Sequence, residues 1–486
     1  PMAGLSKTKL LAHRQCPKRL WLETYRRELA GAEGGAEARM QVGLEVGEIA
    51  RGLHPDGVLI DGRNLTSALV DTADQLAARP RRALFEASFE YRGVLVRTDL
   101  LLPAKRGWRL VEVKASASVK PVHPADVAIQ AWVAEGAGVR LAETALACID
   151  TGFVYSGEGD YRGLFAEHPM GGEIEGLRTE VPKWIRAARA TLAGPEPDIE
   201  PGDQCTDPYA CPFLEHCVPP QEETGYPPEI LPRAKALAEA LRAEGYIDLR
   251  AIPAGRLEYP LHERIRAATA SGVPFLDPEA ERVLKALDHP RHYLDFETIQ
   301  FAVPIWAGTR PYQQVPFQWS CHIEHKDGTL TEHGYLAEGA GDPRPAFIDA
   351  LCAAIRSRGP VFVYNAAFER SRLSELAEAY PSRAKAIGSI IDRLVDLLPL
   401  ARKHYYHPDM RGSWSLKAVA PTIDPTLAYE NLEEVADGGM AQEAFLELIA
   451  PDTPAGRCAA LRDALITYCG RDTFALVRLA HRFAGD

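Results

Sequence analysis

The sequence predicts an α/β protein built from more than one domain. Three segments on either side of residue 100 alternate apolar and polar residues, which is typical of neighbouring β-strands. From residue 292 the pattern becomes strand, strand, strand, helix, strand, helix, which favours a mixed sheet covered by helices. Segments of helical periodicity flank both regions. With 486 residues, the chain is long enough for two to four domains.

The N-terminal region is expected to combine helices with a small sheet. Helical periodicity marks four of its segments, at 5–29, 36–52, 124–137 and 171–193. Extended segments are expected at 83–90, 93–102, 107–114 and 142–150. A Pro/Gly-rich stretch follows at 194–202 and precedes a cysteine-rich segment that ends at Cys217.

Prolines mark a linker after the cysteine-rich segment, at Pro219, Pro220, Pro227 and Pro228. Residues 229–288 then show helical periodicity, with breaks near 252–255 and 272–274. The chain ends in a long helix at about 454–483. We therefore expect three domains: 1–220, a helical middle module at 221–288, and 289–486.

Composition indicates a globular protein in the cytoplasm, with no membrane partner. Hydrophobic residues make up 46% and charged residues 25% of the chain. No apolar run approaches the roughly 18–20 residues that span a bilayer, and a secretory signal pattern is absent. The net charge of -12 does not indicate a nucleic-acid binder, but seven Lys/Arg against two Glu in residues 1–29 make a local basic segment. A solvated helix face explains that segment equally well.

Two acidic residues and a lysine form the first candidate site. On a strand, Glu112 and Lys114 project from the same face, and a hairpin would bring Asp99 beside Glu112. Two carboxylates suit Mg²⁺ or Mn²⁺, and such an ion activates water and polarises a phosphoryl oxygen. Glu86 is a further candidate ligand, and Gln130 a donor to phosphate or water. Alternating Glu and Lys is also ordinary chemistry for an exposed strand.

Four of the nine cysteines are candidates for a metal cofactor. Cys205, Cys211 and Cys217 are evenly spaced, and Cys16 lies far upstream. Four thiolates suit a [4Fe–4S] cluster or a zinc ion. Zinc sites usually contain close Cys-x-x-Cys pairs, so the spacing favours iron–sulfur. The other five cysteines, Cys469 among them, are interpreted mostly as small core residues.

With these cysteines, residues 5–218 resemble the RecB-like nucleases that carry an iron–sulfur cluster, which include CRISPR adaptation nucleases and AddB-type subunits. The resemblance implies a PD-(D/E)XK restriction-endonuclease-like domain. It assigns metal binding to Asp99 and Glu112, catalysis to Lys114 and a motif role to Gln130. Many members also carry a metal-binding histidine in an early helix, where this chain has Gly43-Leu44-Glu45-Val46-Gly47.

A second candidate site begins at Asp295-Phe296-Glu297, whose two carboxylates would share one face of a strand, as a two-metal site requires. Asn365-Ala366-Ala367-Phe368-Glu369 follows, and Tyr468 and Asp472 share a helix face at i and i+4. In this order the motifs resemble DEDD exonucleases, which implies an RNase H-like mixed-sheet domain. The resemblance makes Tyr468 a water-positioning residue and Asp472 a metal ligand. Glu369 stands where the family usually has Asp, and Asp396 is another candidate carboxylate.

As a whole the chain resembles a bacterial family that joins a RecB-like iron–sulfur module to a DEDD-type domain. The leading hypothesis is a two-site, two-metal-ion nuclease (a phosphodiester hydrolase) acting on DNA single strands or ends. One alternative is a nucleic-acid-binding scaffold with one or both sites inactive. Another is an RNA-processing 3′–5′ exonuclease, since DEDD chemistry does not itself distinguish the two sugars.

Overall fold

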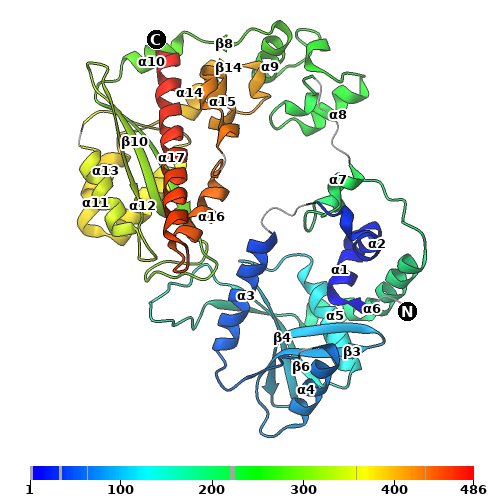
Figure 1. Ribbon diagram of the computed structural model, residues 1–486. Coiled ribbons are helices and arrows are strands. Elements are labelled where there is room, and N and C mark those ends of the chain that lie inside the picture. Colours follow the sequence, from blue (N-terminus) through cyan, green and yellow to red (C-terminus); the bar gives the residue numbers. More distant parts are fainter. Residues whose placement is uncertain are drawn as a thin grey trace. The chain divides into compact units, whose positions relative to one another are not determined.

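The computed structural model describes residues 4–31, 36–62, 64–218, 225–356, 358–432 and 434–485. The α/β class is confirmed, because the chain contains two mixed sheets and many helices. It divides into two compact units, shown in Figure 1. Unit 1 is Pro1–Gln221 with Phe301–Tyr312, and unit 2 is Glu222–Gln300 with Gln313–Asp486.

Unit 1 is built on a seven-stranded sheet in the order β2-β3-β4-β5-β6-β7, with β1 paired to β4. Strands β3, β4 and β5 form an antiparallel meander, and β5 pairs in parallel with β6 across the intervening helix α5. The strands are β1 (Leu5–Ser6), β2 (Val58–Leu59), β3 (Leu84–Tyr91), β4 (Val94–Ala104), β5 (Gly107–Lys114), β6 (Leu141–Ile149) and β7 (Phe165–Pro169).

Helices cover both faces of this sheet. One core lies under α1, α5 and α6, and a smaller one under α3, where Ala50 packs with Phe85, Leu100 and Val111. The helices are α1 (Lys7–Gln15), α2 (Pro17–Tyr25), η1 (Arg27–Leu29), α3 (Ala36–Gly52), α4 (Leu65–Ala77), α5 (His123–Gly136), α6 (Gly171–Ala193), η2 (Asp203–Cys205) and α7 (Leu214–Cys217).

Unit 2 contains a five-stranded sheet in the order β11-β10-β9-β12-β13. Strands β11, β10 and β9 pair antiparallel, whereas β9, β12 and β13 pair in parallel. The strands of this unit are β8 (Phe275–Leu276), β9 (Arg291–Ile299), β10 (Val315–Glu324), β11 (Leu330–Leu336), β12 (Val361–Val363), β13 (Leu394–Asp396) and β14 (Tyr405–Tyr406). The short β8 and β14 pair with each other.

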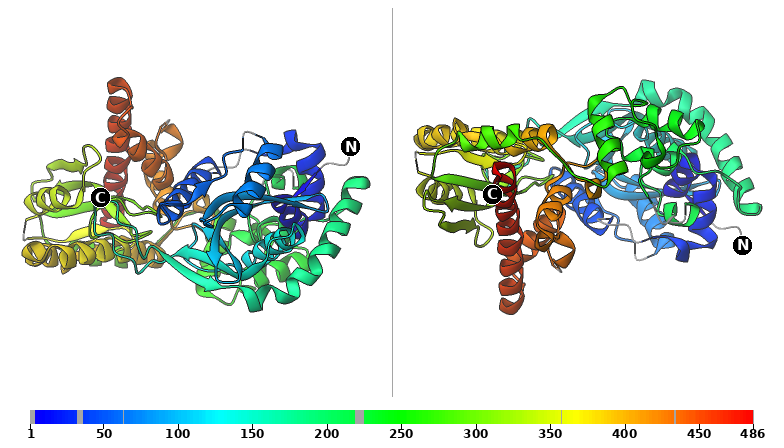
Figure 2. Two further views of the ribbon diagram at one scale, coloured as in Figure 1. Left: turned by 90° about the horizontal axis from the view of Figure 1, so that it is seen from below. Right: turned by 90° about the horizontal axis from the view of Figure 1, so that it is seen from above.

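Three helices cover one face of this sheet, and the long α17 crosses the other (Figures 1 and 2). Side chains alternate along β9, so Leu294 and Phe296 enter the core under α11–α13, while Tyr293 enters the core on the α17 side. The principal helices are α8 (Lys235–Ala243), α9 (Pro260–Ser271), α10 (Glu279–Lys285), α11 (Arg344–Ala354), α12 (Ala367–Ala379), α13 (Ala384–Ile391), α14 (Leu397–His404), α15 (Leu416–Ile423), α16 (Gly438–Ile449) and α17 (Ala455–Ala484). Short 3-10 turns are η3 (Pro228–Ile230), η4 (Leu249–Ala251), η5 (Pro381–Arg383), η6 (Pro408–Met410), η7 (Pro425–Leu427) and η8 (Tyr429–Asn431).

The structure differs from the sequence-based expectation in three places. The helix expected at 5–29 is broken at Cys16, whose extended backbone (φ -159°, ψ 119°) precedes Pro17, because the residue before a proline disfavours helical geometry. The helical segment expected as a separate module at 221–288 packs into unit 2, where Leu241 and Ile265 share a core with Leu476. The connection Phe301–Tyr312 returns to unit 1.

No helix among the described residues is long and apolar enough to cross a membrane.

Candidate metal and catalytic sites

The first candidate site lies on the β4–β5 hairpin of unit 1. The pairing of Leu100 with Val111 brings Asp99 beside Glu112, and Asp99 Oδ2 accepts a 2.7 Å hydrogen bond from the Val113 backbone N–H. Glu112 and Lys114 project from the same face, and Lys114 Nζ lies 2.6 Å from Glu112 Oε1. The structure therefore brings together the three residues that the sequence grouped.

Two further residues, Lys7 and Asp126, complete this site. Lys7 Nζ lies 2.8 Å from Glu112 Oε1 and 3.0 Å from Asp126 Oδ1, and Lys114 Nζ lies 2.7 Å from Asp126 Oδ2. Gln130 donates to Glu112 Oε2 at 2.6 Å and to Asp126 Oδ1 at 2.9 Å. Asp126 precedes Gln130 by one helical turn on α5, and that spacing is a signal the sequence contained. From the sequence, Lys7 is only one of the seven Lys/Arg residues of the basic segment, with no sign of a role at this site.

Charge and burial set the protonation of this network. Burial alone would raise the pKa of Glu112, which is 2% exposed, but the charges of Lys7 and Lys114 outweigh burial and lower it. Burial and the charge of Glu112 raise the pKa of Asp99 well above its ordinary value. Glu112 is therefore a carboxylate already neutralised by two ammonium groups, and Asp99 is a carboxyl group that a cation would ionise.

Glu86 borders this site in an unusual backbone conformation. It has a φ of 56° and lies between the pairs Phe85–Leu100 and Ala87–Thr98, so it faces Asp99 across a gap in the β3–β4 ladder. Burial raises its pKa, and Arg51 of α3 lies 3.7 Å from its carboxylate. The structure thus places Glu86 near the site, with an arginine from the early helix as its partner.

Replacing Lys7 with Met is expected to destabilise the metal-free protein by a few kcal/mol, because it removes one of the two cations that neutralise buried Glu112. Mg²⁺ is expected to restore more stability to this variant than to the wild type. Lys9→Met is the matched control, since Lys9 Nζ donates to the Gly4 carbonyl in an exposed position. Calorimetry in chelator and in Mg²⁺ measures both effects, and equal melting temperatures for the two variants would contradict them.

The four cysteines proposed as cofactor ligands lie around one small pocket of unit 1: Cys16, Cys205, Cys211 and Cys217. Burial raises the pKa of the Cys211 and Cys217 thiols, and the neighbouring cysteines raise it further. Cys16 occupies the break between α1 and α2, and the other three come from the segment after α6. The four cysteines that line this pocket therefore come from two segments almost 190 residues apart.

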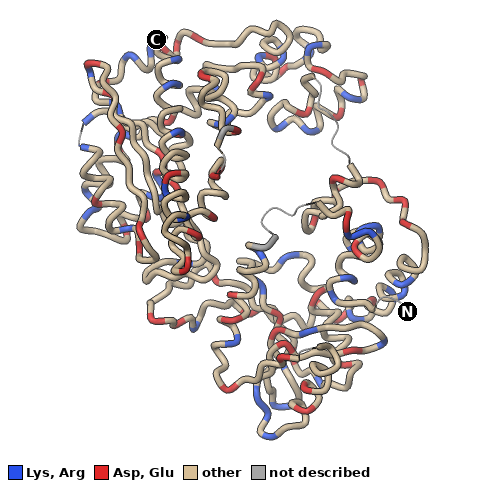
Figure 3. The backbone as a smooth tube through the Cα atoms, in the orientation of Figure 1, with Lys and Arg blue, Asp and Glu red and all other residues tan. Residues whose placement is uncertain are grey.

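The surroundings of the pocket bind the same two segments together. Gln15 donates to the carbonyl oxygens of Gln204 (2.8 Å) and Tyr209 (2.7 Å), and Lys18 lies 3.2 Å from Glu196. Arg14 stacks over the Trp184 ring at 3.8 Å. Several Lys and Arg positions of α1 and α2, drawn blue in Figure 3, therefore have partners within unit 1. Much of the positive charge in the basic segment is therefore used for contacts within unit 1.

The second candidate site lies between β9 and α17 in unit 2. Asp295 and Glu297 project from the face of β9 toward α17, and Asp472 approaches from that helix. Burial raises the pKa of Glu297 to about 8 and that of Asp472 to about 6, and it raises that of Asp295 well above its ordinary value. The charge of Asp472 adds to the shifts of Asp295 and Glu297. When ionised, these carboxyl groups repel one another, and a bound cation would offset the repulsion.

Glu369 adds a fourth carboxyl group from the first turn of α12. It is 1% exposed, its Oε2 has no hydrogen-bond partner among the described residues, and burial raises its pKa to about 8. Its charge contributes to the raised pKa of Asp295, so the two residues are neighbours. A buried carboxylate oxygen without a partner fits a ligand position for Mg²⁺ or Mn²⁺.

Asp396 has a structural role instead. Its Oδ1 accepts from the backbone N–H groups of Leu398 and Asn365, each at 2.9 Å, and its Oδ2 accepts from Ala366 at 3.0 Å. These bonds cap α14 and hold Asn365, at a φ of 74°, just before α12. Asp396 thereby positions the helix that carries Glu369, and its oxygens are occupied without a metal.

Two tyrosines and a lysine surround Asp472. The Tyr429 hydroxyl donates to Asp472 Oδ1, and the Tyr468 ring lies 6.3 Å from that of Tyr429. Lys417 Nζ lies 5.4 Å from the centre of the Tyr429 ring and 5.6 Å from that of Tyr468. Burial raises the pKa of Tyr468, and the charges of Asp472 and Glu297 raise it further, so its hydroxyl remains protonated. The sequence indicated Tyr468 but not Tyr429.

Replacing Glu369 with Gln is expected to flatten the pH dependence of stability in metal-free buffer. The pKa of Glu369 is about 8 in the folded protein and 4.5 as its ordinary value, so between about pH 5 and pH 8 the folded state holds a proton that the unfolded state has released. Wild-type stability therefore falls as pH rises through this window. Denaturant unfolding at several pH values should show Glu369→Gln gaining a few kcal/mol over the wild type near pH 8 and little near pH 5. Parallel curves would contradict this.

Each unit is thus a mixed α/β fold with buried carboxyl groups on its sheet. Residues 292–415 match a family model described as a domain of unknown function, DUF2779. "Uncharacterized protein MG366 homolog" of Mycoplasma pneumoniae is 28% identical over 219 residues, which are 40% of this chain and 32% of that protein. "Uncharacterized protein MG366" of Mycoplasma genitalium is 24% identical over 206 residues, 38% of this chain and 31% of that protein. The chain spans about a third of the length of these relatives.

A solved structure titled "Crystal structure of SSO0001" is similar with a TM-score of 0.25 and 16% identity, covering 44% of this chain and 85% of that one.

Proposed function

We propose that the protein is a metal-dependent nuclease that hydrolyses phosphodiester bonds in DNA. The observation that carries this proposal is the position of Glu297, Glu369 and Asp472 around Asp295, on which the charges of all three act. Burial raises the pKa values of all four carboxyl groups. Four such groups balance the charge of two divalent cations. Paired Mg²⁺ or Mn²⁺ ions stabilise the attacking and leaving oxygens of an in-line displacement at phosphorus.

The strand order of unit 2 supports an RNase H-like fold for this site. Three antiparallel strands are extended by two parallel ones, and the carboxyl groups come from the first strand, from α12 and from the last helix. In the proposed reaction Tyr468 orients the attacking water. Lys417, whose charge opposes the raised pKa values of Glu297 and Asp472, would contribute to binding the phosphate. We propose a DEDD-type exonuclease domain here.

Unit 1 supports a second, PD-(D/E)XK-type site. Three antiparallel strands, a helix and a parallel strand follow one another as β3, β4, β5, α5 and β6, with Asp99, Glu112 and Lys114 on β4 and β5. Asp99, Glu112 and Glu86 would hold the metal ion, and Gln130 Oε1, buried without a partner among the described residues, would accept from a bound water. A [4Fe–4S] cluster on the four cysteines would join the ends of this domain.

One observation favours the alternative of a binding scaffold for unit 1. Lys7 and Lys114 already neutralise Glu112 and Asp126, so this site needs a cation less than the second site does. If unit 1 is an active nuclease, cleavage at its site requires Lys114, whereas a binding scaffold does not need Lys114 for cleavage.

A nuclease assay tests the proposal with single- and double-stranded DNA and RNA, labelled at either end, in Mg²⁺ or Mn²⁺. Lys114→Ala disables the first site and Asp295→Ala the second, and the double variant gives the background. We expect Asp295→Ala to remove stepwise trimming from one end, and Lys114→Ala to remove any remaining cutting. Unchanged cleavage by both variants would overturn the assignments, and preferential cleavage of RNA would replace the DNA substrate by the RNA-processing alternative.

A further inference from the structure

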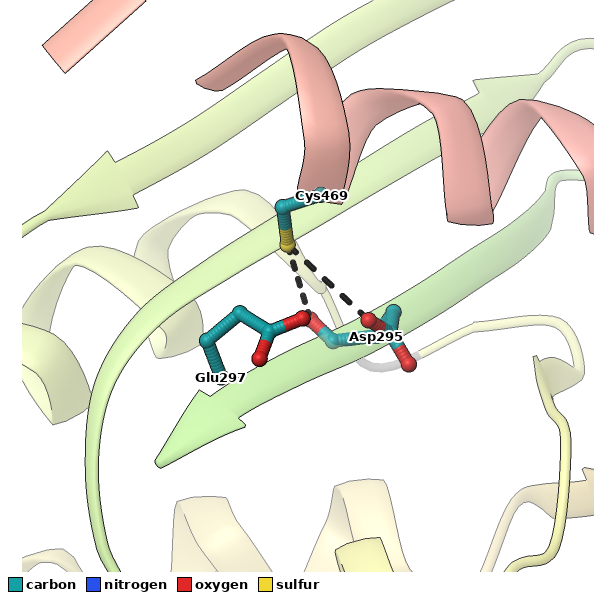
Figure 4. A group of neighbouring side chains, drawn as sticks. All are labelled: Asp295, Glu297 and Cys469. Carbon is teal, nitrogen blue, oxygen red and sulfur yellow. Dashed lines mark hydrogen bonds between the residues drawn. The ribbon is translucent and has the colours of Figure 1, made fainter. Parts of the chain in front are cut away.

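Cys469 of α17 lies against the two carboxylates of β9 rather than in apolar surroundings. One ligand atom each from Asp295, Glu297 and Cys469 lies within 4.8 Å of the others, and Figure 4 shows the thiol pointing at Asp295 beside Glu297. The Sγ atom is 4.0 Å from Asp295 Oδ2 and 3.9 Å from the Asp295 backbone oxygen. Cys469 and Glu297 are buried, and Asp295 is half-buried.

The spacing of these atoms is close to that of a coordination sphere. A thiolate about 2.3 Å and a carboxylate oxygen about 2.1 Å from one divalent ion, at tetrahedral angles, lie roughly 3.6 Å apart. The observed 4.0 Å is slightly longer, so a small side-chain rotation would bring sulfur and oxygen onto one ion. Glu369, whose charge acts on Asp295, has a buried Oε2 without a hydrogen-bond partner among the described residues.

Cys321 shows what an ordinary core cysteine looks like in this sheet. It lies on β10 opposite Leu294 and packs with Phe347 and Ile348 in the core under α11. Cys469 is equally buried, but its sulfur faces carboxyl groups, where a thiol gains little from apolar packing. Helix α17 thus brings a soft ligand into a centre that otherwise offers hard oxygen ligands.

We infer that Cys469 is a third ligand of the metal centre at Asp295 and Glu297, which makes the centre selective for thiophilic divalent cations such as Co²⁺, Zn²⁺ and Cd²⁺ over Mg²⁺. This rests on the proposed metal binding by Asp295 and Glu297. The thiol loses its proton to solvent when the ion binds, and the resulting thiolate supplies the electron pair of the metal–sulfur bond. No oxidation state changes.

Titration of the full-length protein with Co²⁺ tests this inference, because a thiolate bound to Co²⁺ gives a charge-transfer absorption in the near ultraviolet that oxygen ligands do not give. The four cysteines of unit 1 are present in the wild type and in each variant, so the difference between two titrations isolates the second site. We expect Cys469→Ser to lose part of the absorption and to bind Cd²⁺ at least tenfold more weakly, with Mg²⁺ affinity unchanged. Cys321→Ala is the matched control and should retain the wild-type spectrum.

Three outcomes separate this inference from the proposed function. Identical Co²⁺ spectra and Cd²⁺ affinities for wild type and Cys469→Ser, together with loss of metal binding in Asp295→Asn, would overturn the sulfur ligand and leave the carboxylate site standing. An Asp295→Asn variant that binds metals like the wild type would overturn both the sulfur ligand and the proposed carboxylate metal site. Loss of the sulfur absorption in Cys321→Ala as well as Cys469→Ser would attribute the signal to altered packing and would also overturn the inference. Circular dichroism on each variant verifies that it is folded.

Discussion

Replacing Asp295 with Asn is expected to reduce cleavage by the second site about 1000-fold, and at the same time to stabilise the metal-free protein. Activity falls because a bound metal ion contributes several kcal/mol to stabilising the transition state, and the neutral amide is a poor ligand. Stability rises because burial and the charge of Asp472 together raise the pKa of Asp295, so the native fold opposes its ionisation at neutral pH. Initial rates with end-labelled DNA and melting temperatures in chelator measure the two effects.

A substitution that lowers activity but raises stability marks a functional carboxylate, whereas one that lowers stability marks a structural one. Asp396→Asn is the contrasting variant, because Asp396 accepts three backbone hydrogen bonds. We expect it to lower the melting temperature in metal and in chelator alike. An Asp295→Asn variant that melts below the wild type in chelator would show that Asp295 is needed for folding rather than for metal binding.

The secondary structure could be predicted in most of the chain because its apolar patterns are regular. The β3–β4–β5 strands, the strand and helix order from residue 292, and the final helix appear as expected. The break at Cys16 was not predicted, although the following Pro17 is a signal for it. The small strand β7 and the helix α4 were not predicted either. β7 is only five residues long, whereas α4 carries a start signal, because Asn64 caps it and accepts from the Ser67 backbone N–H.

The site residues were predictable where one motif held them, and not where the fold brought distant segments together. Glu112 and Lys114 are two residues apart, so strand geometry sufficed. Lys7 is 105 residues from Glu112, and no local pattern distinguishes it from Lys9 in the same helix. Tyr468 and Asp472 placed this helix at the site of Asp295, but no local pattern shows that Cys469 between them also faces β9.

Replacing Cys211 with Ser is expected to destabilise unit 1 by several kcal/mol and to abolish the visible absorption of an iron–sulfur protein. A cluster on Cys16 and Cys211 closes a loop of almost 200 residues, and cross-links of that length restrict the unfolded chain by about 5 kcal/mol in the loop-entropy account. Metal bonds to the folded cysteines add to this. Calorimetry, iron and sulfide analysis and the visible spectrum measure the effect, and Cys352→Ser in unit 2 is the control. A colourless wild type with one zinc per chain would identify zinc as the cofactor instead.

The same variant connects the cysteine pocket to the first active site. Helix α1 begins with Lys7, which contacts Glu112 and Asp126, and ends immediately before Cys16. If the metal centre on the four cysteines holds Cys16 in place, loss of that centre also releases α1, the helix that carries Lys7. We therefore expect Cys211→Ser and Lys7→Met to be less than additive in stability, because both remove the same contact with Glu112. Full additivity in a double-mutant cycle would show that the centre supports the ends of the domain without acting on the Lys7–Glu112 contact.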